Sequence, residues 1–336
     1  MSSPNLLLTG ATGLIGFSVL LKALEQGYKV RAAVRSASKA EYLAKHPKIV
    51  ALGRSDQLSF IEVPDITAEE AYYEAIKEVT YVIHLAAPLP SPSLDMITDI
   101  YEPNVRSAVN ILHAAIKEPL VKKVVTTSSI AGNLPPTPSS NKITAESRTP
   151  NFPGPYTSHM QAYAAGKVAA LNAMDKFVVD NNPSFDVVKV YPGFVFGRDE
   201  RALKPQDLVS GSNALVLGSI TGQQGANDLP SGVVHIEDTA NLFLWGLKPD
   251  APANIGATIY GVLSDAWDIV KTHFPKAVED GIFTEGSWSN YKIDWDSTQT
   301  ETHFGFRFKS FEEMVVDVAG QYLELLAKEK SHSASL

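Results

Sequence analysis

Residues 9–17, T-G-A-T-G-L-I-G-F, constrain the fold more than any other stretch of this chain. Glycines recur every three positions, at Gly10, Gly13 and Gly16, between an apolar run at 6–8 and a segment with helical spacing. Glycine adopts backbone angles that other residues avoid and lets a ligand approach the main chain. A helix N-terminus favours an anionic group. The stretch therefore predicts a strand, a tight turn and a helix that bind a pyrophosphate, although its spacing differs from G-x-G-x-x-G.

Strand-like and helix-like patterns alternate along the first half of the chain. Strands are predicted at residues 6–8, 28–34, 59–63, 81–85, 123–127 and 186–191, and helices at 15–26, 38–45, 68–77, 104–116 and 161–179. Such alternation is typical of an α/β fold with a doubly wound, parallel sheet of the Rossmann type, whose ligands bind beyond the carboxyl ends of the strands.

The pattern weakens after Tyr191, and this change predicts two domains. We expect a dinucleotide-binding domain at residues 1–191 and a smaller, less regular substrate lobe at 192–336, with 233–262 returning to the first domain. The aromatic residues of the second part are expected either to line an apolar pocket or to pack in a core: Phe194, Phe196, Trp267, Phe283, Trp288 and Tyr291.

Composition excludes several kinds of site. The 336 residues include no cysteine, which excludes disulfides, thiolate metal sites and cysteine nucleophiles. The eight histidines show no ligand spacing, so no metal site is expected. The net charge of −8 argues against nucleic acid or an anionic membrane as the partner. No apolar run approaches the ~20 residues that span a bilayer, and the N-terminus has no signal-peptide pattern, so we expect a cytoplasmic protein.

The end of the second predicted strand indicates which dinucleotide binds. An acid about 20 residues after the glycine turn usually holds the ribose hydroxyls of NAD. Here Arg35, Ser36 and Lys39 stand instead. Because guanidinium and ammonium groups suit a 2′-phosphate, we expect NADP(H), and the alternative is that these are ordinary solvated charges. Asp65, followed by Ile66, comes after the third strand and is expected either to contact adenine or to cap the next helix.

Hydroxyl and amine groups that could perform chemistry follow the fifth strand. Tyr163 and Lys167 are four residues apart on the predicted long helix, so they share one helical face. A nearby ammonium is expected to lower the pKa of the phenol from about 10, so that it can exchange a proton with a carbonyl or alcohol oxygen. A serine after the fifth strand, Ser128 or Ser129, could donate to the same oxygen. The alternative is a surface Tyr–Lys pair.

The chain resembles the extended short-chain dehydrogenases/reductases. The motifs that carry the resemblance are Gly10, Gly13 and Gly16 of a TGxxGxxG turn, and the segments His84–Pro88, Asn104–Asn110, Tyr191–Gly197 and Val234–Asp238. Residues 30–35 resemble dihydroflavonol and cinnamoyl-CoA reductases, and residues 35–41 resemble the yeast methylglyoxal/isovaleraldehyde reductases even more closely. Those relatives reduce aldehydes and ketones with NADPH and occur as monomers or homodimers, and the same is expected here.

The resemblance implies the site residues. It assigns catalysis to Ser129, Tyr163 and Lys167, with Ser128 as the alternative serine. The expected cofactor-binding residues are Gly10, Thr12, Gly13, Leu14, Ile15, Gly16, Arg35, Ser36, Lys39, Asp65, Ile66, Leu85, Ala86, Ala87, Thr127, Tyr163, Lys167, Pro192, Gly193 and Val195. The proline-rich stretch 134–140 is expected to border the site.

These observations predict an NADPH-dependent carbonyl reductase with Tyr163 as proton donor and a small-molecule carbonyl substrate. A nucleotide-sugar epimerase or dehydratase is one alternative. Ile130-Ala131 stands where dehydratases carry Asp-Glu, and residues 132–136, G-N-L-P-P, replace the tyrosine and glycine that epimerases carry shortly after the serine. A non-catalytic, NADP-sensing protein is the other alternative, but it would have no reason to retain the serine, tyrosine and lysine together.

Overall fold

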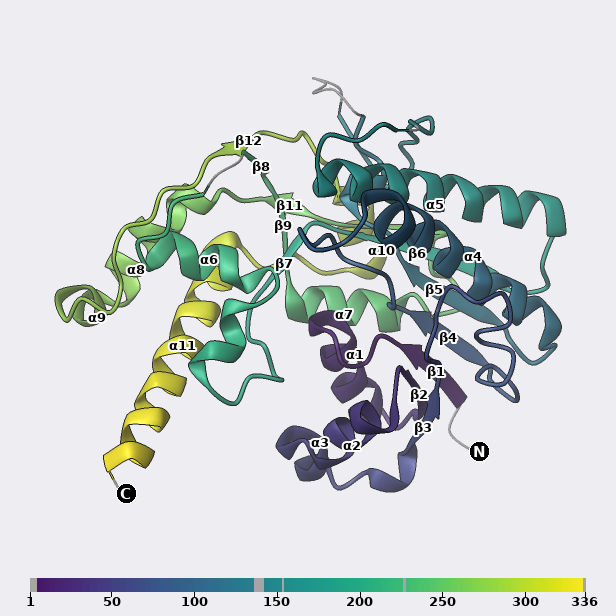
Figure 1. The fold of residues 1–336 in the computed structure, drawn as a ribbon, viewed down its shortest axis with the longest axis horizontal. Coiled ribbons are helices and arrows are strands. Elements are labelled where there is room, and N and C mark those ends of the chain that lie inside the picture. The colour runs from purple at the N-terminus through teal and green to yellow at the C-terminus, as the bar shows by residue number, and fades with distance from the viewer. Residues whose placement is uncertain (1–4, 136–141, 153, 226–227, 335–336) are drawn as a thin grey trace. The chain divides into compact units, whose positions relative to one another are not determined.

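The computed structural model describes residues 5–135, 142–152, 154–225 and 228–334 (Figure 1). The chain divides into two compact units. The first comprises the described residues of 1–139, 143–191 and 240–256, and the second those of 140–142, 192–239 and 257–336. The segment that returns to the first unit, 240–256, is shorter than the expected 233–262. Most of the proline-rich stretch 134–140 lies outside the described residues.

A seven-stranded sheet forms the centre of the first unit. Its strands, in spatial order, are β10 (Asn254–Ala257), β6 (Asp186–Pro192), β5 (Lys123–Thr127), β4 (Tyr81–His84), β1 (Asn5–Thr9), β2 (Lys29–Val34) and β3 (Leu58–Glu62). The pairings from β6 to β3 are all parallel. After β3 the chain returns to the other side of β1, so the strand order reverses between β1 and β4. Ligands bind at such switch points, and the predicted α/β fold is confirmed.

Helices cover both faces of this sheet (Figure 1). They are α1 (Leu14–Glu25), α2 (Ala37–Lys45), α3 (Pro47–Leu52), α4 (Glu102–Lys117), α5 (His159–Asn181) and α7 (Ile236–Trp245), and the short turns are η1 (Ser55–Gln57), the π-helical η2 (Met96–Tyr101) and η3 (Ile130–Gly132). Helices α4 and α5 lie side by side on one face and α1 lies on the other (Figure 1). The core forms because strand residues such as Leu7 and Val124 are fully buried between these layers.

The predicted helix at 68–77 is absent, and successive turns occupy this described segment. Amide groups here bond three residues back, as from Ala71 to Ala68, or four, as from Ile76 to Tyr72, without forming a regular α-helix. The Arg31 guanidinium of β2 donates to the carbonyls of Ala75 and Lys77, at 2.9 and 2.7 Å. These two bonds hold the end of the segment to β2.

The second unit contains short strands and helices around its own apolar core. The strands are β7 (Phe194–Phe196), β8 (Leu229–Pro230), β9 (Gly232–His235), β11 (Ile259–Tyr260) and β12 (Asn290–Tyr291), and the helices are η4 (Pro205–Val209), α6 (Asn213–Ile220), η5 (Leu263–Asp265), α8 (Ala266–His273), α9 (Pro275–Glu279), α10 (Thr298–Phe304) and α11 (Phe311–Ala334). Phe196 and Phe283 are buried in the core, Phe194, Trp267 and Trp288 pack against it, and Tyr291 is exposed. Most of these aromatic side chains therefore contribute to packing.

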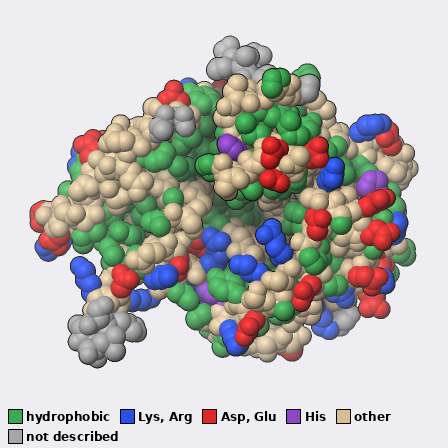
Figure 2. Space-filling model, viewed as in Figure 1, with side chains coloured by type: hydrophobic (Ala, Val, Ile, Leu, Met, Phe, Trp, Pro, Cys, Tyr) green, Lys and Arg blue, Asp and Glu red, His purple; other side chains and the backbone are tan. Residues whose placement is uncertain are grey.

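Charged side chains of both signs are interspersed on the visible surface near α4 and α5 (Figure 2). Several are paired along the helices, as in Arg106–Glu102 on α4 and Lys176–Asp180 on α5. Such exposed pairs contribute little to stability. In the part of the chain that the structure describes, no helix is long and apolar enough to cross a membrane.

Candidate active site

The glycine turn brings bare backbone to the carboxyl end of β1. Gly10 has φ +75°, and a Cβ there would lie 2.9 Å from the amide nitrogen of Ala86. A Cβ on Gly16 would lie 2.0 Å from the Gly10 carbonyl oxygen, so only glycine permits this turn. Gly13 is exposed and begins α1, whose N-terminus no side chain among the described residues caps. Exposed backbone at an uncapped helix N-terminus fits the pyrophosphate of a dinucleotide.

A chain of hydrogen bonds fixes the strand end beside this turn. The Thr9 hydroxyl accepts from the amides of Leu85 and Ala86, at 3.1 and 3.0 Å, and donates to Nδ1 of His84 at 2.9 Å. The other ring nitrogen of His84 bonds to the Ser107 carbonyl. Burial lowers the pKa of His84 to about 3, so the ring is neutral. The backbone expected to pass the cofactor at residues 85–87 is therefore held from β1.

Cations follow β2 as the sequence predicts. Arg35 and Lys39 are exposed, and neither forms an ion pair with any residue that the structure describes. Between them, Ser36 is half-buried and its hydroxyl lies 2.9 Å from that of Ser38. These groups fit a phosphate on the adenosine ribose, because the cations are not already neutralised by carboxylates of the protein.

Asp65 is engaged by its own turn. Its Oδ1 accepts from the amide and the hydroxyl of Thr67, at 2.8 and 2.7 Å, and the Thr67 hydroxyl holds the pKa of Asp65 below its usual range. The Asn110 amide of α4 donates to the carbonyls of Ile66 and Ala68, at 3.3 and 2.8 Å. Asp65 thus orders the backbone after β3, and its contact with adenine stays a prediction.

The structure places Ser129, rather than Ser128, against Tyr163. Ser129 precedes η3, is half-buried and hydrogen-bonds the Tyr163 side chain. Ser128 is buried, and its Oγ has no hydrogen-bond partner among the described residues. A Cβ on Gly132 would lie 3.1 Å from that Oγ and 3.3 Å from the Lys167 carbonyl oxygen, so η3 packs closely on α5. This packing brings the serine segment to the tyrosine helix.

Lys167 lies beneath the tyrosine ring. Its Nζ is 5.5 Å from the centroid of the Tyr163 ring, and burial lowers its pKa to about 8. The expected lowering of the Tyr163 pKa is not found. Burial raises it to about 12, and the hydrogen bond from Ser129 opposes this only in part. The phenol is therefore protonated at neutral pH, as a proton donor must be.

A small cavity of about 10 Å³, with both polar and apolar side chains in its lining, adjoins Lys167. It is lined also by Asn104, Thr126, Thr127 and Ser128. Among the described residues, Oδ1 of Asn104 and the hydroxyls of Thr126 and Ser128 are buried without hydrogen-bond partners. Space of this size accommodates about one water molecule. Ser128 therefore contributes to the lining of this cavity.

Pro192, Gly193 and Val195 belong to the second unit. A Cβ on Gly193 would lie 2.5 Å from the Gly232 carbonyl oxygen, so within that unit the glycine permits close packing of strands. Val195 is buried. The contacts of these residues with a cofactor stay predictions.

Sequence reasoning missed the supporting residues Thr9 and Asn110. Both are buried polar side chains. Thr9 ends an apolar run, a signal that could have identified it, whereas Asn110 lies in a helix with many other polar residues and has no such signal. No group of His, Asp or Glu side chains that could hold a metal ion occurs in the described segments.

The chain is similar to known proteins over nearly its whole length. Residues 6–253 match a family described as the NAD dependent epimerase/dehydratase family. The chain is 34% identical over 349 aligned positions to "Ketoreductase CTB6" of Cercospora beticola, covering 98% of each protein. It is 36% identical over 346 positions to "NAD-dependent epimerase/dehydratase ALT6" of Alternaria alternata, covering 95% of this chain and 98% of that protein.

A solved structure shares the fold. The crystal structure of the yeast methylglyoxal/isovaleraldehyde reductase Gre2 complexed with NADPH matches with a TM-score of 0.79 and 24% identity, covering 96% of this chain and 99% of the other. The family match spans the glycine turn, the serine segment and the helix that carries the tyrosine and lysine. The chain therefore belongs to the NAD dependent epimerase/dehydratase family, the extended short-chain dehydrogenases/reductases.

Proposed function

We propose that this protein is an NADPH-dependent carbonyl reductase that converts an aldehyde or a ketone to an alcohol. The observation that carries the proposal is the grouping of Ser129, Tyr163 and Lys167 in the first unit, which also holds the glycine turn. The names of relatives support it, because one is called a ketoreductase and one a methylglyoxal/isovaleraldehyde reductase.

Each of these residues has a distinct role in the proposed reaction. The nicotinamide, when bound, supplies hydride to the carbonyl carbon. Tyr163 donates its proton to the carbonyl oxygen, because its raised pKa keeps the phenol protonated. Ser129 hydrogen-bonds the phenol and can donate to the same oxygen. The charge of Lys167 stabilises the phenolate that remains. Because Lys167 is buried, holding this charge costs desolvation energy, and its pKa is lowered for the same reason.

NADP(H) is proposed over NAD(H) because of the cations after β2. Arg35 offers a planar fork of donors and Lys39 a point charge, both exposed. The relative Gre2 was crystallised with NADPH, which agrees with this assignment. We further propose a small carbonyl compound as the partner, and neither nucleic acid nor a membrane.

The test is consumption of NADPH with a panel of aldehydes, ketones and keto esters. We expect Tyr163→Phe to lower kcat by about a hundredfold to ten-thousandfold, because it removes the general acid. Tyr260→Phe, which changes an exposed tyrosine of the second unit, is the matched control and should keep full activity.

Other outcomes would replace the proposal. Full activity of Tyr163→Phe would exclude the mechanism. Turnover of a UDP-sugar with a retained cofactor would favour an epimerase or dehydratase, whereas NADP binding without turnover of any substrate would favour a sensing protein.

A further inference from the structure

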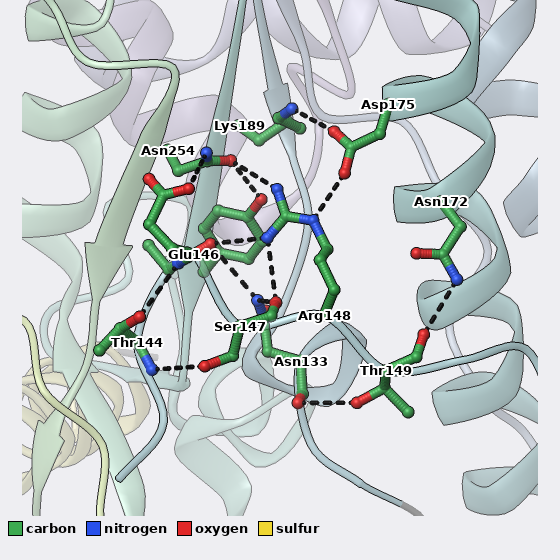
Figure 3. A network of polar contacts seen from close by, with 12 residues as sticks. Asn133, Thr144, Glu146, Ser147, Arg148, Thr149, Asn172, Asp175, Lys189 and Asn254 are labelled. Carbon is green, nitrogen blue, oxygen red and sulfur yellow. Dashed lines mark hydrogen bonds and ion pairs between the residues drawn. The ribbon is translucent and has the colours of Figure 1, made fainter.

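A network of polar contacts, partly exposed to solvent, joins residues of α5 to neighbouring segments (Figure 3). Its centre is Arg148, whose guanidinium has partners on several elements. Nε donates to Oδ2 of Asp175 on α5 at 2.6 Å, and Nη2 donates to Oδ1 of Asn254 on β10 at 3.1 Å. Nη1 donates to the carbonyls of Ala145 and Ser147, at 2.9 and 3.0 Å. One side chain therefore joins the 145–149 segment to a helix and a strand.

The 145–149 segment also contacts the end of η3, the short turn that Ser129 directly precedes. Asn133 follows η3 and is buried. The side-chain amide of Asn133 donates to the Ser147 carbonyl at 2.7 Å. The backbone carbonyl of Asn133 accepts from the Thr149 hydroxyl at 3.0 Å (Figure 3). Within η3, the Gly132 amide bonds to the Ser129 carbonyl. Hydrogen bonds and one peptide bond therefore connect Arg148 to Ser129, by way of the Ser147 carbonyl, Asn133 and Gly132.

The network also holds the helix that carries Tyr163. Asp175 accepts from Arg148 and, through Oδ1, from the ammonium of the buried Lys189 of β6 at 2.6 Å. Asp175 lies 12 residues beyond Tyr163, which is about 18 Å along the helix. Asn172, on the same helix, donates to the Thr149 carbonyl at 3.0 Å. The segment after the serine is therefore fastened to the tyrosine helix at more than one point.

Stability alone does not account for such a network, because ion pairs as exposed to solvent as Arg148–Asp175 contribute little to the free energy of unfolding. What it adds is fixed geometry. The guanidinium is planar and its donors diverge at set angles, so bonds to several partners hold their relative positions. The elements that it joins are those that bear the serine and the tyrosine.

We infer that Arg148 is a positioning residue that sets the separation of Ser129 and Tyr163 by fastening the 145–149 segment to α5. This inference rests on the proposed function, because positioning matters only if both groups act on one substrate oxygen. Arg148 touches neither of them, so it acts through Asn133 and Asp175.

The first test is kinetic. We expect Arg148→Met to lower kcat by about tenfold to a hundredfold, because a displacement of about 1 Å can cost a hundredfold in rate. NADPH affinity should be unchanged, and the deuterium isotope effect with C4-deuterated NADPH should rise as the chemical step slows. Arg148→Lys restores the charge beside Asp175 but not the planar set of guanidinium donors. It should therefore recover any melting temperature that Arg148→Met loses, but not kcat. Lys176→Met, which removes an exposed pair on α5, is the matched control and should change none of these.

The second test needs no turnover. Hydrogen–deuterium exchange of the amides of Gly132 and Asn133 should be faster in Arg148→Met than in wild type, and unchanged in Lys176→Met. If Arg148→Met does not fold, Thr149→Val, which removes only the hydroxyl bonded to Asn133, should show the same changes in smaller measure.

The inference is overturned if exchange at these amides is unchanged, if kcat is unchanged, or if Arg148→Lys recovers kcat together with stability. It is also overturned if kcat and NADPH affinity fall by the same factor. A wild-type protein that reduces no carbonyl compound would defeat the proposed function, whereas the exchange measurement would still decide whether Arg148 fastens the serine segment.

Discussion

Lys167, which the proposed mechanism uses, is a buried amine whose charge lowers the stability of the folded protein. Its side chain is 5% exposed, and no ion pair with a described residue compensates its charge. Burial lowers its pKa to about 8, against about 10.4 for a free lysine. Near neutral pH the folded protein therefore carries a charge that the unfolded chain holds more favourably.

This difference predicts a pH-dependent effect of Lys167→Met on the free energy of unfolding. Because the folded pKa lies below the unfolded value, wild-type stability is lost as pH falls toward about 8 and rises as pH increases above it. Relative to Lys167→Met, wild type should gain about 2 kcal/mol between about pH 7 and about pH 9.5. Urea denaturation at both pH values measures this, and carbonyl reduction should be lost in the variant.

Lys176→Met is the control for this comparison, because that lysine is 74% exposed. It should show no such change relative to wild type. A difference between wild type and Lys167→Met that stays constant with pH would mean that the amine is not desolvated in solution.

At the scale of elements, side-chain hydrogen bonds join β1 to the segment after β4, at the point where the strand order reverses. The Thr9 hydroxyl satisfies two amides of the segment after β4 and one nitrogen of His84. The Thr126 hydroxyl of β5 is buried without a hydrogen-bond partner among the described residues. Two threonines at the same edge of the sheet therefore differ in whether protein groups satisfy their hydroxyls.

We predict that Thr9→Val lowers the free energy of unfolding by about 2 kcal/mol, because it leaves buried donors and an acceptor unpaired. Thr126→Val, the same chemical change, should be neutral or slightly stabilising. Urea denaturation of both variants at one pH tests the pair. An equal loss in both would show that the Thr126 hydroxyl has a partner in solution, such as a water molecule in the adjoining cavity.

At the scale of the whole molecule, binding of the proposed cofactor should appear as global stability. A ligand at about 100 times its Kd stabilises the folded state by about 2.7 kcal/mol. Because Arg35 and Lys39 are exposed and suited to a phosphate, NADPH should raise the melting temperature more than NADH at equal concentration. Arg35→Ala should remove most of that difference.

Arg307→Ala, which changes an exposed arginine of the second unit, is the control and should leave the difference intact. Thermal unfolding with each nucleotide gives the result. Equal stabilisation of wild type by NADPH and NADH would contradict the assignment of NADP(H).

The sequence by itself determined the features that depend on near neighbours in the chain. The alternation of strand and helix patterns predicted the sheet, and Gly10, Gly13 and Gly16 predicted the turn after β1. The spacing of Tyr163 and Lys167 predicted their shared helical face. Such patterns are readable because helical and strand periods place residues a few positions apart on one face.

Only the tertiary structure decided what depends on distant residues. It placed Ser129 rather than Ser128 against the phenol, engaged Arg31 with the turns that replace a predicted helix, and raised the pKa of Tyr163 through burial. It also assembled the network around Arg148 from residues separated by 27 and 106 positions in the chain. Burial and long-range contacts set these outcomes. Neither produces a periodic pattern in the sequence that could be used to predict it.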